Sequence, residues 1–266
     1  MKSICVAFRC LLLLLIFGAF SCTPGATELY TPKELSKLLH DAGGWALLPF
    51  PDSKYEPGSI VRITPENGIR WIGSAQSCGI SPEVLRPVPG DVPPLNLSKK
   101  TTFSGSLAVK YQGIEVGPEY AKVKNVVLKI NKMTSSGIDL IKLSNWLNDP
   151  ANHATFSATC TEYLTPADQY FQNEGLSISD GSFTLYDKDD KKLSLTAANL
   201  GQYFGGSLKA SLSVETDGSV TFDKPYFLAI RTAHRKGNVF ETLGPSRETT
   251  PPSAGDQILV TLSEKY

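Results

Sequence analysis

Two segments in the middle of the chain alternate between apolar and polar residues, and this feature restricts the fold more than any other. In GSLAVKYQGIEV the apolar residues Leu107, Val109 and Tyr111 are two positions apart, and AKVKNVVLKIN repeats the pattern from Val126 to Ile130. A period of two places such side chains on one face of an extended strand, whereas a helix requires a period near 3.6. The two segments therefore predict neighbouring strands of a half-buried β-sheet.

Shorter β-rich runs lie on both sides of these segments. WALLPF, SIVRI and IRWIGSA precede them, and QYFQNEGLSI, GSFTLYD and KLSLT follow. Pro, Gly, Asn and Asp separate the runs about every eight to twelve residues, which is typical of antiparallel strands joined by short turns. Two of these turns are expected at 179–181 and at 187–192.

The sequence also predicts a small number of helices. Thr31, Pro32 and Glu34 have the pattern of a capping box with proline at the first helical position, and Gly43-Gly44 should end that helix. A second helix is predicted in SGIDLIKLSNWLNDP, and a third helix start lies at 165–168. The predicted fold class is therefore α+β, with a mainly antiparallel β-sheet and two or three short helices.

The folded part is expected to be one domain covering 31–266. The segment 81–94 contains five prolines, so we expect no regular strand pairing there. It is either a stiff surface crossing or a boundary that makes the domain bilobed. FSGSL at 103–107 and FGGSL at 204–208 are similar to each other, and Gly117 and Gly218 follow at the same offset. Either a weak repeat of two hairpins or shared turn chemistry explains this match.

The N-terminus has the pattern of an export signal. Lys2 and Arg9 flank an apolar run at 11–20, which is too short to cross a bilayer as a helix. The run ends in Ala-Phe-Ser followed by Cys22. This pattern resembles the lipobox of bacterial lipoprotein precursors. The resemblance implies a signal peptide at 1–21, cleavage before Cys22 and lipidation of Cys22.

The same resemblance implies that residues 22–30 form a tether between the lipid and the domain. Several acyl chains give stable anchoring without a membrane-spanning helix. Thr23 is not the Asp that favours inner-membrane retention in enterobacterial lipoproteins, so an outer-membrane location is implied where the source has two membranes. A secretory signal cleaved a few residues later and a retained anchor are the alternatives.

The five cysteines divide between the signal and the domain. The lipoprotein resemblance implies that Cys5 and Cys10 leave with the signal peptide and that Cys22 is lipidated. Cys78 and Cys160 remain, and an even pair in an oxidising compartment predicts a disulfide. Two buried free thiols are the alternative.

We find no pattern that assigns catalytic residues. There is no G-x-S-x-G motif, and the histidines are His40, His153 and His234. His40 lies where a cation suits the end of the first predicted helix. His153 and Cys160 are seven residues apart, which matches no hydrolase signature.

We also predict no metal site and no cofactor. YDKDDKK resembles the start of a calcium loop, but Lys192 and Ala198 occupy positions where such a loop requires Gly and Glu. A solvated hairpin turn is the better interpretation. Trp45, Trp71 and Trp146 are interpreted as core residues, and a sugar-binding platform of exposed aromatic residues is the alternative. The 26 basic and 26 acidic residues balance, so the composition does not favour nucleic acid as a partner.

Two functions remain open. The first is a non-enzymatic, membrane-anchored envelope lipoprotein that binds another protein, a polysaccharide or a small molecule. The second is a pore-forming protein that inserts hairpins near 103–131 and 204–232, because strands of a membrane barrel also alternate between apolar and polar residues. The order of a capped helix, GGWALLPFPDSKYEPGSIVRI, two separated hairpins and YFLAIR is similar to that of gasdermin-like pore formers. Members of that family act from the cytosol, whereas the signal peptide implies export.

Overall fold

A computed structural model describes residues 29–65, 68–95, 107–112, 123–153, 156, 168–200, 212–236 and 239–242. Twelve strands in these ranges belong to one sheet. They are β1 (Leu29–Tyr30), β2 (Ala46–Asp52), β3 (Ser59–Thr64), β4 (Gly68–Ser74), β5 (Val88–Gly90), β6 (Leu107–Gln112), β7 (Asn125–Gly137), β8 (Gln169–Tyr186), β9 (Leu212–Val214), β10 (Val220–Phe222), β11 (Tyr226–Lys236) and β12 (Val239–Thr242).

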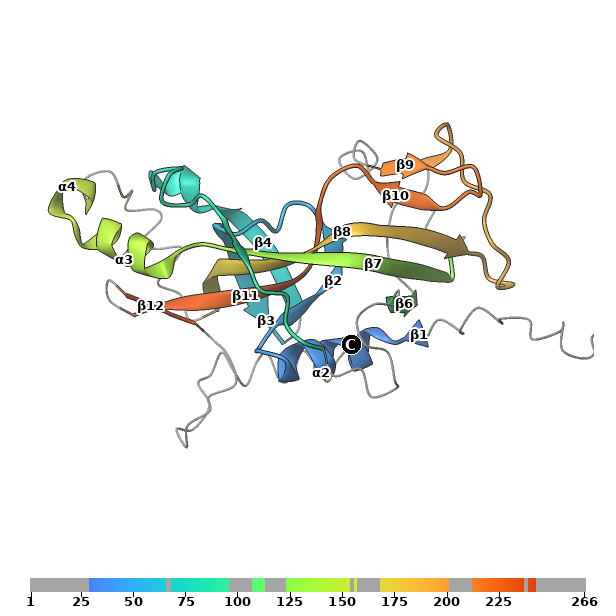
Figure 1. Ribbon diagram of the computed structural model, residues 1–266, viewed down its shortest axis with the longest axis horizontal. Helices are drawn as coiled ribbons and strands as arrows, with labels where there is room; N and C mark the ends of the chain where they lie inside the picture. The colour runs from blue at the N-terminus through green and yellow to red at the C-terminus, as the bar shows by residue number, and fades with distance from the viewer. Residues whose placement is uncertain are drawn as a thin grey trace, which may run out of the picture.

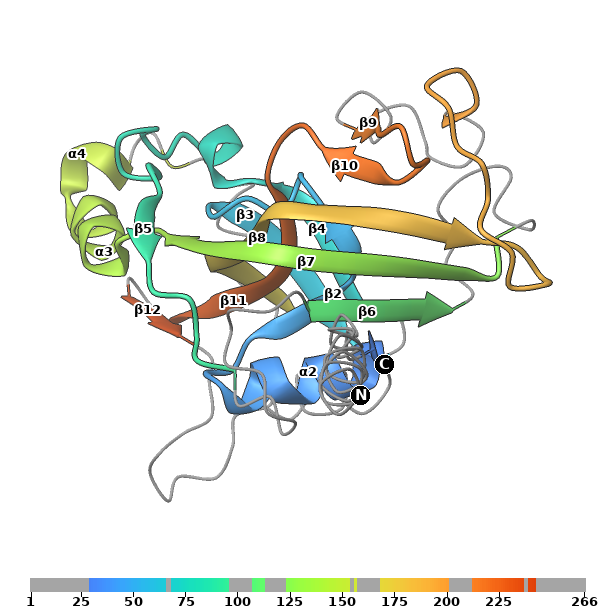
Figure 2. The same cartoon turned by 45° about the vertical axis from the view of Figure 1, so that its right-hand side comes forward.

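The central path of the sheet runs β1-β6-β7-β8-β10-β9. Figure 2 shows β6, β7, β8 and β10 following one another in this order. β11 pairs with β2, β8 and β12, and β3 pairs with β4 and β8. All of these pairs are antiparallel except β1 with β6, which is parallel. The predicted α+β class with a mainly antiparallel sheet is confirmed in this form, and the sheet is mixed because of β1.

The turn predicted at 179–181 is wrong, because β8 runs through it. The 18 residues of β8 form a single strand. The register between β7 and β8 shifts on both sides of the pair between Lys132 and Asp180, so a bulge in each strand absorbs the irregularity and β8 continues. The turn predicted at 187–192 does form, but KLSLT contributes only an isolated bridge between Lys192 and Tyr186.

The Pro-rich crossing also differs from its prediction. β5 lies within it and pairs antiparallel with the C-terminal end of β7, matching Val88 with Gly137 and Gly90 with Ser135. Proline is tolerated there because β5 is a three-residue strand that pairs with β7 alone among the described strands. The crossing therefore extends the sheet.

Three α-helices lie among the described residues, α2 (Pro32–Asp41), α3 (Leu140–Asn148) and α4 (Pro150–His153). The predicted capping box of α2 is present: the Thr31 hydroxyl accepts from the Glu34 amide, and the Glu34 carboxylate accepts from the Thr31 amide. α3 starts at its cap Asp139 and ends before Asp149, as predicted. α4 follows directly. α3 and α4 lie at one end of β7 (Figure 1).

Apolar side chains form three clusters on the faces of the sheet. Trp45 is buried in the largest cluster, and Trp146 packs partly buried against the second. The prediction of Trp71 as a core residue is wrong, because 40% of its surface is exposed on β4. Its ring N–H donates to the Ser59 hydroxyl. Among the described residues, no helix is both long enough and apolar enough to cross a membrane.

Candidate functional site

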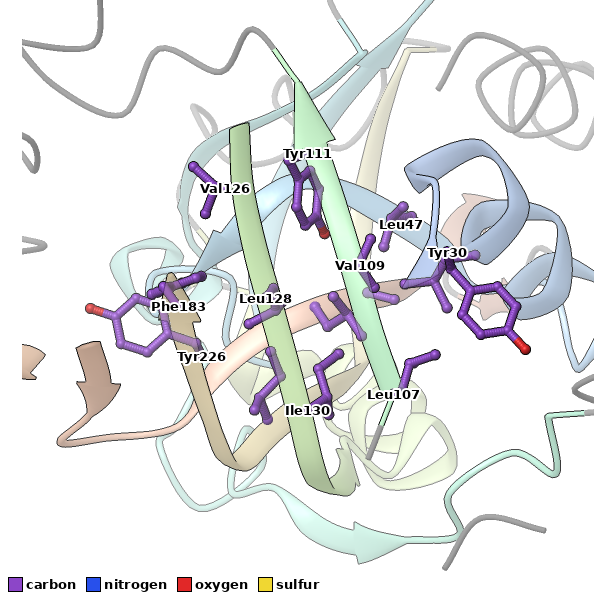
Figure 3. Packing of buried hydrophobic residues seen from close by; sticks show 14 of the residues in the cluster. Tyr30, Leu47, Leu107, Val109, Tyr111, Val126, Leu128, Ile130, Phe183 and Tyr226 are labelled. Carbon is purple, nitrogen blue, oxygen red and sulfur yellow. The ribbon is translucent and has the colours of Figure 1, made fainter. Parts of the chain in front are cut away.

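The two alternating segments form one apolar surface on β6 and β7. Leu107 pairs with Ile130, Val109 with Leu128, and Tyr111 with Val126. Directly paired residues of antiparallel strands point to the same side, so these six side chains make one continuous face, which we call the apolar ribbon. All six are at most 3% exposed. Figure 3 shows Leu107, Val109 and Tyr111 along β6, with Val126, Leu128 and Ile130 along β7.

The far half of β8 extends the apolar ribbon. Leu185 pairs with Val126 and Phe183 pairs with Leu128, and both are fully buried. The Phe50 ring from β2 stacks on Phe183 at 5.1 Å and meets Tyr111 edge-on at 5.5 Å. The ribbon is thus a packed hydrophobic surface that gains stability through burial, at about 25 cal/mol per Å² of apolar area.

The opposite face of β6 and β7 is more polar. It presents Lys110 and Gln112 on β6 and Lys129 and Asn131 on β7, all half-buried or exposed. Asn131 donates its side-chain N–H to the Asp180 carboxylate at 3.2 Å. One side of these strands is therefore apolar and the other carries polar and positively charged groups.

The second predicted hairpin is present in part. β9 and β10 pair antiparallel, and β10 also pairs with β8. Gly218 holds the turn at φ 75°, a conformation that residues with a side chain adopt only at a cost. The Ser219 hydroxyl and amide donate to the Asp217 carboxylate, and these bonds lower the pKa of that group. The FGGSL copy and Gly117 lie outside the described residues, as do the first four residues of FSGSL, so the repeat stays a prediction.

β1 and α2 cover one side of the apolar ribbon. Tyr30 of β1 pairs with Val109 of β6, while Leu35 and Leu39 of α2 are fully buried in the same cluster as the ribbon. α2 contacts both β2 and β6. Figure 3 shows Tyr30 between α2 and the Val109 side of β6. The last two residues of the predicted tether are therefore part of the sheet.

Tyr111 is the polar exception within the ribbon. Its hydroxyl is buried and has no hydrogen-bond partner among the described residues. Burial raises the pKa of Tyr111, because the charged phenolate loses its hydration. A buried polar group without a partner costs about 1–3 kcal/mol, so the folded state carries this cost.

The acidic turn after β8 has a structural role. The Asp187 carboxylate accepts from the amides of Asp189 and Lys191 and closes the turn. The Asp190 carboxylate accepts from the Lys124 ammonium at 2.9 Å and from the side-chain Nδ2 of Asn125 at 2.7 Å. The Lys124 bond is the main cause that lowers the pKa of Asp190. Among the described residues, no group of three or more His, Cys, Asp or Glu could hold a metal.

A second polar region, which we did not predict from the sequence, lies where β8 changes partners. β8 pairs with β3 up to Phe171 and with β7 from Glu174 onward. We define the residues at this point, Gln172 to Gly175 together with Arg231, as the β8 junction. The Arg231 guanidinium donates to both oxygens of the Glu174 carboxylate, at 3.0 and 3.1 Å.

Asn173 is the bulged residue of the junction. Arg231 pairs with Glu174 and the next residue, Thr232, pairs with Gln172, so Asn173 has no counterpart on β11. The Gln172 side chain donates to the Tyr55 carbonyl at 2.7 Å. Polar residues inside an otherwise apolar run, QNE before GLSI, are the sequence signal that could have revealed this site.

The residues singled out from the sequence do not gather into one site. Cys78 is buried in a 3₁₀ turn, η1 (Ala75–Cys78), whereas Cys22 and Cys160 lie outside the described residues. Lipidation of Cys22 and a disulfide between Cys78 and Cys160 therefore stay predictions. His40 lies in the last turn of α2, as expected. His234 lies on β11 beside Tyr170, at 5.8 Å between ring centroids.

Comparisons with known proteins place the fold only loosely. No family model matches the chain, and no curated protein matches it. A solved structure of a bacterial gasdermin from Bradyrhizobium tropiciagri is similar, with a TM-score of 0.36 and 15% identity over 79% of this chain and 90% of that chain. The Gasdermin A3 membrane pore gives a TM-score of 0.29 and 12% identity over 82% of this chain and 96% of that chain.

Both neighbours belong to the class that the order of elements resembled. A likeness at this level carries no argument about function.

Proposed function

We propose that this protein inserts into membranes and forms a pore, using the hairpins near 103–131 and 204–232. The observation that carries the proposal is the apolar ribbon, a continuous apolar face on paired strands. Its reverse side carries Lys110, Gln112 and Lys129 together with the apolar residues Ala108 and Val127. Strands of a membrane barrel turn an apolar face to lipid and a polar face to the lumen. The ribbon matches this requirement once its present cover is removed.

The lengths of the strands show what insertion would require. A strand crosses a bilayer with about 9–11 residues when tilted. β7 contains 13 residues, whereas β6 contains 6 and β9 and β10 contain 3 each, so these three strands would have to lengthen on insertion. A closed barrel satisfies all backbone hydrogen bonds within the hydrocarbon region, which a single hairpin cannot do. Several copies must therefore assemble for the proposed pore to form.

We also propose that the protein is exported and held at the cell envelope through lipid on Cys22, at the outer membrane where one exists. The short apolar run that leads into a Cys supports this proposal. A lipid anchor keeps the domain at high local concentration beside the bilayer, which favours insertion without any new contact. Fatty-acid labelling should mark the wild-type protein and leave Cys22→Ala unlabelled. Freely secreted, unlabelled wild-type protein would end this proposal.

Dye-loaded vesicles test pore formation directly. Purified full-length protein is added to vesicles of phosphatidylethanolamine and phosphatidylglycerol, at neutral and acidic pH and after limited proteolysis. Leakage is expected in at least one of these conditions. Absence of leakage in all of them would reject the pore and leave the binding of a protein, polysaccharide or small molecule as the function.

A pair of neighbouring positions tests how the strands face the bilayer. A fluorescent amino acid of tyrosine-like shape replaces either Tyr111, on the apolar ribbon, or Lys110, on the polar face. Vesicles containing nitroxide-labelled lipid should quench the probe at 111 strongly and the probe at 110 weakly. Equal quenching at both positions would contradict insertion of β6 as a barrel strand.

A further inference from the structure

β1 occupies the edge of β6 that a barrel needs. Within the described sheet it is the parallel exception, and it pairs with only two residues of β6, Leu29 with Ala108 and Tyr30 with Val109. Membrane barrels are built from antiparallel neighbours around a closed circle. A parallel strand at this edge therefore blocks the position where the strand of a neighbouring copy must pair.

α2 follows β1 after the single residue Thr31 and is stabilised locally. Both halves of its capping box are made within the segment 31–34. Its contact with the rest of the protein consists mainly of the apolar side, where Leu35 and Leu39 are fully buried. Because these capping bonds do not involve the sheet, release of β1 and α2 from the ribbon does not have to break them.

While β1 and α2 cover the apolar ribbon, the Tyr111 hydroxyl stays buried and its desolvation cost remains. The Tyr111 hydroxyl has no hydrogen-bond partner in the described part of the chain, and it lies in the same hydrophobic cluster as Tyr30, Leu35 and Leu39. Tyrosine is favoured where its ring contacts apolar groups and its hydroxyl reaches water, as at the interface of a membrane. Opening the cover and inserting the strand would relieve the cost of this buried hydroxyl.

We propose that the segment 29–41, comprising β1 and α2, is a latch that must leave the edge of β6 before that edge pairs with a strand of a second copy of this chain. This inference rests on the proposed pore. It assigns the edge of β6 as the assembly surface and β1 with α2 as the element that controls access to it.

A reversible staple tests the latch. Leu29→Cys together with Ala108→Cys places two thiols at paired positions of β1 and β6, where a disulfide would hold the latch closed. The control, Arg62→Cys with Arg70→Cys, staples the β3–β4 hairpin, whose residues at these positions are also paired. Peptide mapping establishes that the two introduced cysteines have paired with each other and not with a native cysteine. Wild-type protein with and without reductant accounts for effects on those native cysteines.

Oxidised Leu29→Cys/Ala108→Cys protein should release dye at least tenfold more slowly than wild type and recover fully after reduction. The control staple should leak at the wild-type rate in both states. Leakage of the oxidised latch variant at the wild-type rate would overturn the latch while leaving the pore intact. Absence of leakage from wild type itself would instead overturn the proposed pore, and the latch with it.

Exchange of backbone amides gives a second measurement in the same samples. Addition of vesicles should raise the exchange of amides in 29–41 at least tenfold in wild type and in the reduced latch variant, and leave it unchanged in the oxidised variant. Unchanged exchange in leaking wild-type protein would contradict release of the latch.

Discussion

The apolar ribbon and the β8 junction lie in the same sheet but are held together by different forces. The ribbon is stabilised by burial of aliphatic and aromatic side chains, which has no direction and depends on area. The junction is held by directional contacts, namely the two hydrogen bonds from Arg231 to Glu174 and the bond from Gln172 to the Tyr55 carbonyl. A surface of the first kind can exchange one apolar partner for another, including lipid. A region of the second kind loses its bonds if it moves, so it is suited to remain folded as a base.

The largest effect is expected from the ribbon, where packing decides stability. Leu128 is fully buried, and Leu128→Ala should lower the free energy of unfolding by about 3 kcal/mol through lost burial and a residual cavity. Val127→Ala is the control, because Val127 is half-buried on the opposite face of β7 and should cost less than about 1.5 kcal/mol. Urea unfolding measures both. Equal losses would show that the ribbon is not the better packed face.

The junction should respond to a single added methyl group. A Cβ at Gly175 would lie 2.5 Å and 2.6 Å from two ring carbons of Phe227, closer than packed atoms allow. Gly175→Ala should therefore destabilise the protein by about 1–3 kcal/mol by overpacking. Gly73→Ala is the matched control, since nothing lies within 4 Å of its added Cβ. If thermal unfolding showed no loss of stability in Gly175→Ala, the Phe227 ring would have to move away from the added Cβ at little cost.

The sequence predicted the ribbon better than the junction, and the reason is physical. Alternation from Leu107 to Ile130 is a local signal, and local periodicity decides which face of a strand is buried. The junction depends on Glu174 meeting Arg231, which is 57 residues away, and no local pattern encodes such a contact. The missed continuation of β8 has a similar cause, because it depends on register shifts against the distant strand β7, on both sides of the pair between Lys132 and Asp180.

Other elements follow the same rule. The capping box of α2 was predicted in full because all its partners lie within four residues. Trp71 was misplaced because its type favours burial, whereas its position on β4 leaves it largely uncovered. The pairing of β5 was missed because prolines reduce strand propensity without forbidding a short edge strand.

An intermediate effect of opposite sign is expected at the one polar atom of the ribbon. Tyr111→Phe removes a buried hydroxyl without a described partner and keeps the ring that contacts Phe50. The free energy of unfolding should rise by about 1 kcal/mol, because the desolvation cost of the hydroxyl disappears. Tyr186→Phe is a suitable control, since Tyr186 is half-buried at the end of β8. A loss of stability in Tyr111→Phe would mean that the hydroxyl contributes favourably, and the contrast between ribbon and junction would then weaken.

The smallest effect concerns the exposed pair between Lys124 and Asp190, which joins the start of β7 to the turn after β8. The hydrogen bond from Lys124 lowers the pKa of Asp190 from 3.8, so the carboxylate form is favoured in the folded state. A lowered pKa in the folded state contributes stability above the pKa of the unfolded chain, and this contribution disappears as the pH falls through the folded value. Asp190→Asn should therefore cost a little stability at pH 7 and progressively less below about pH 4.

Asp189→Asn is the control, because it removes the same charge from the adjacent residue. Comparing the two variants separates the effect of losing the Lys124–Asp190 pair from the effect of changing the net charge. Urea unfolding of the two variants at pH 7 and pH 3, at low and high salt, measures the difference. Because the Lys124–Asp190 pair is exposed, salt should reduce its contribution. An Asp190→Asn loss that persists at pH 3 and in high salt would indicate that the Asn125 hydrogen bond holds the end of the ribbon. In that case this end would depend on directional contacts, as the junction does.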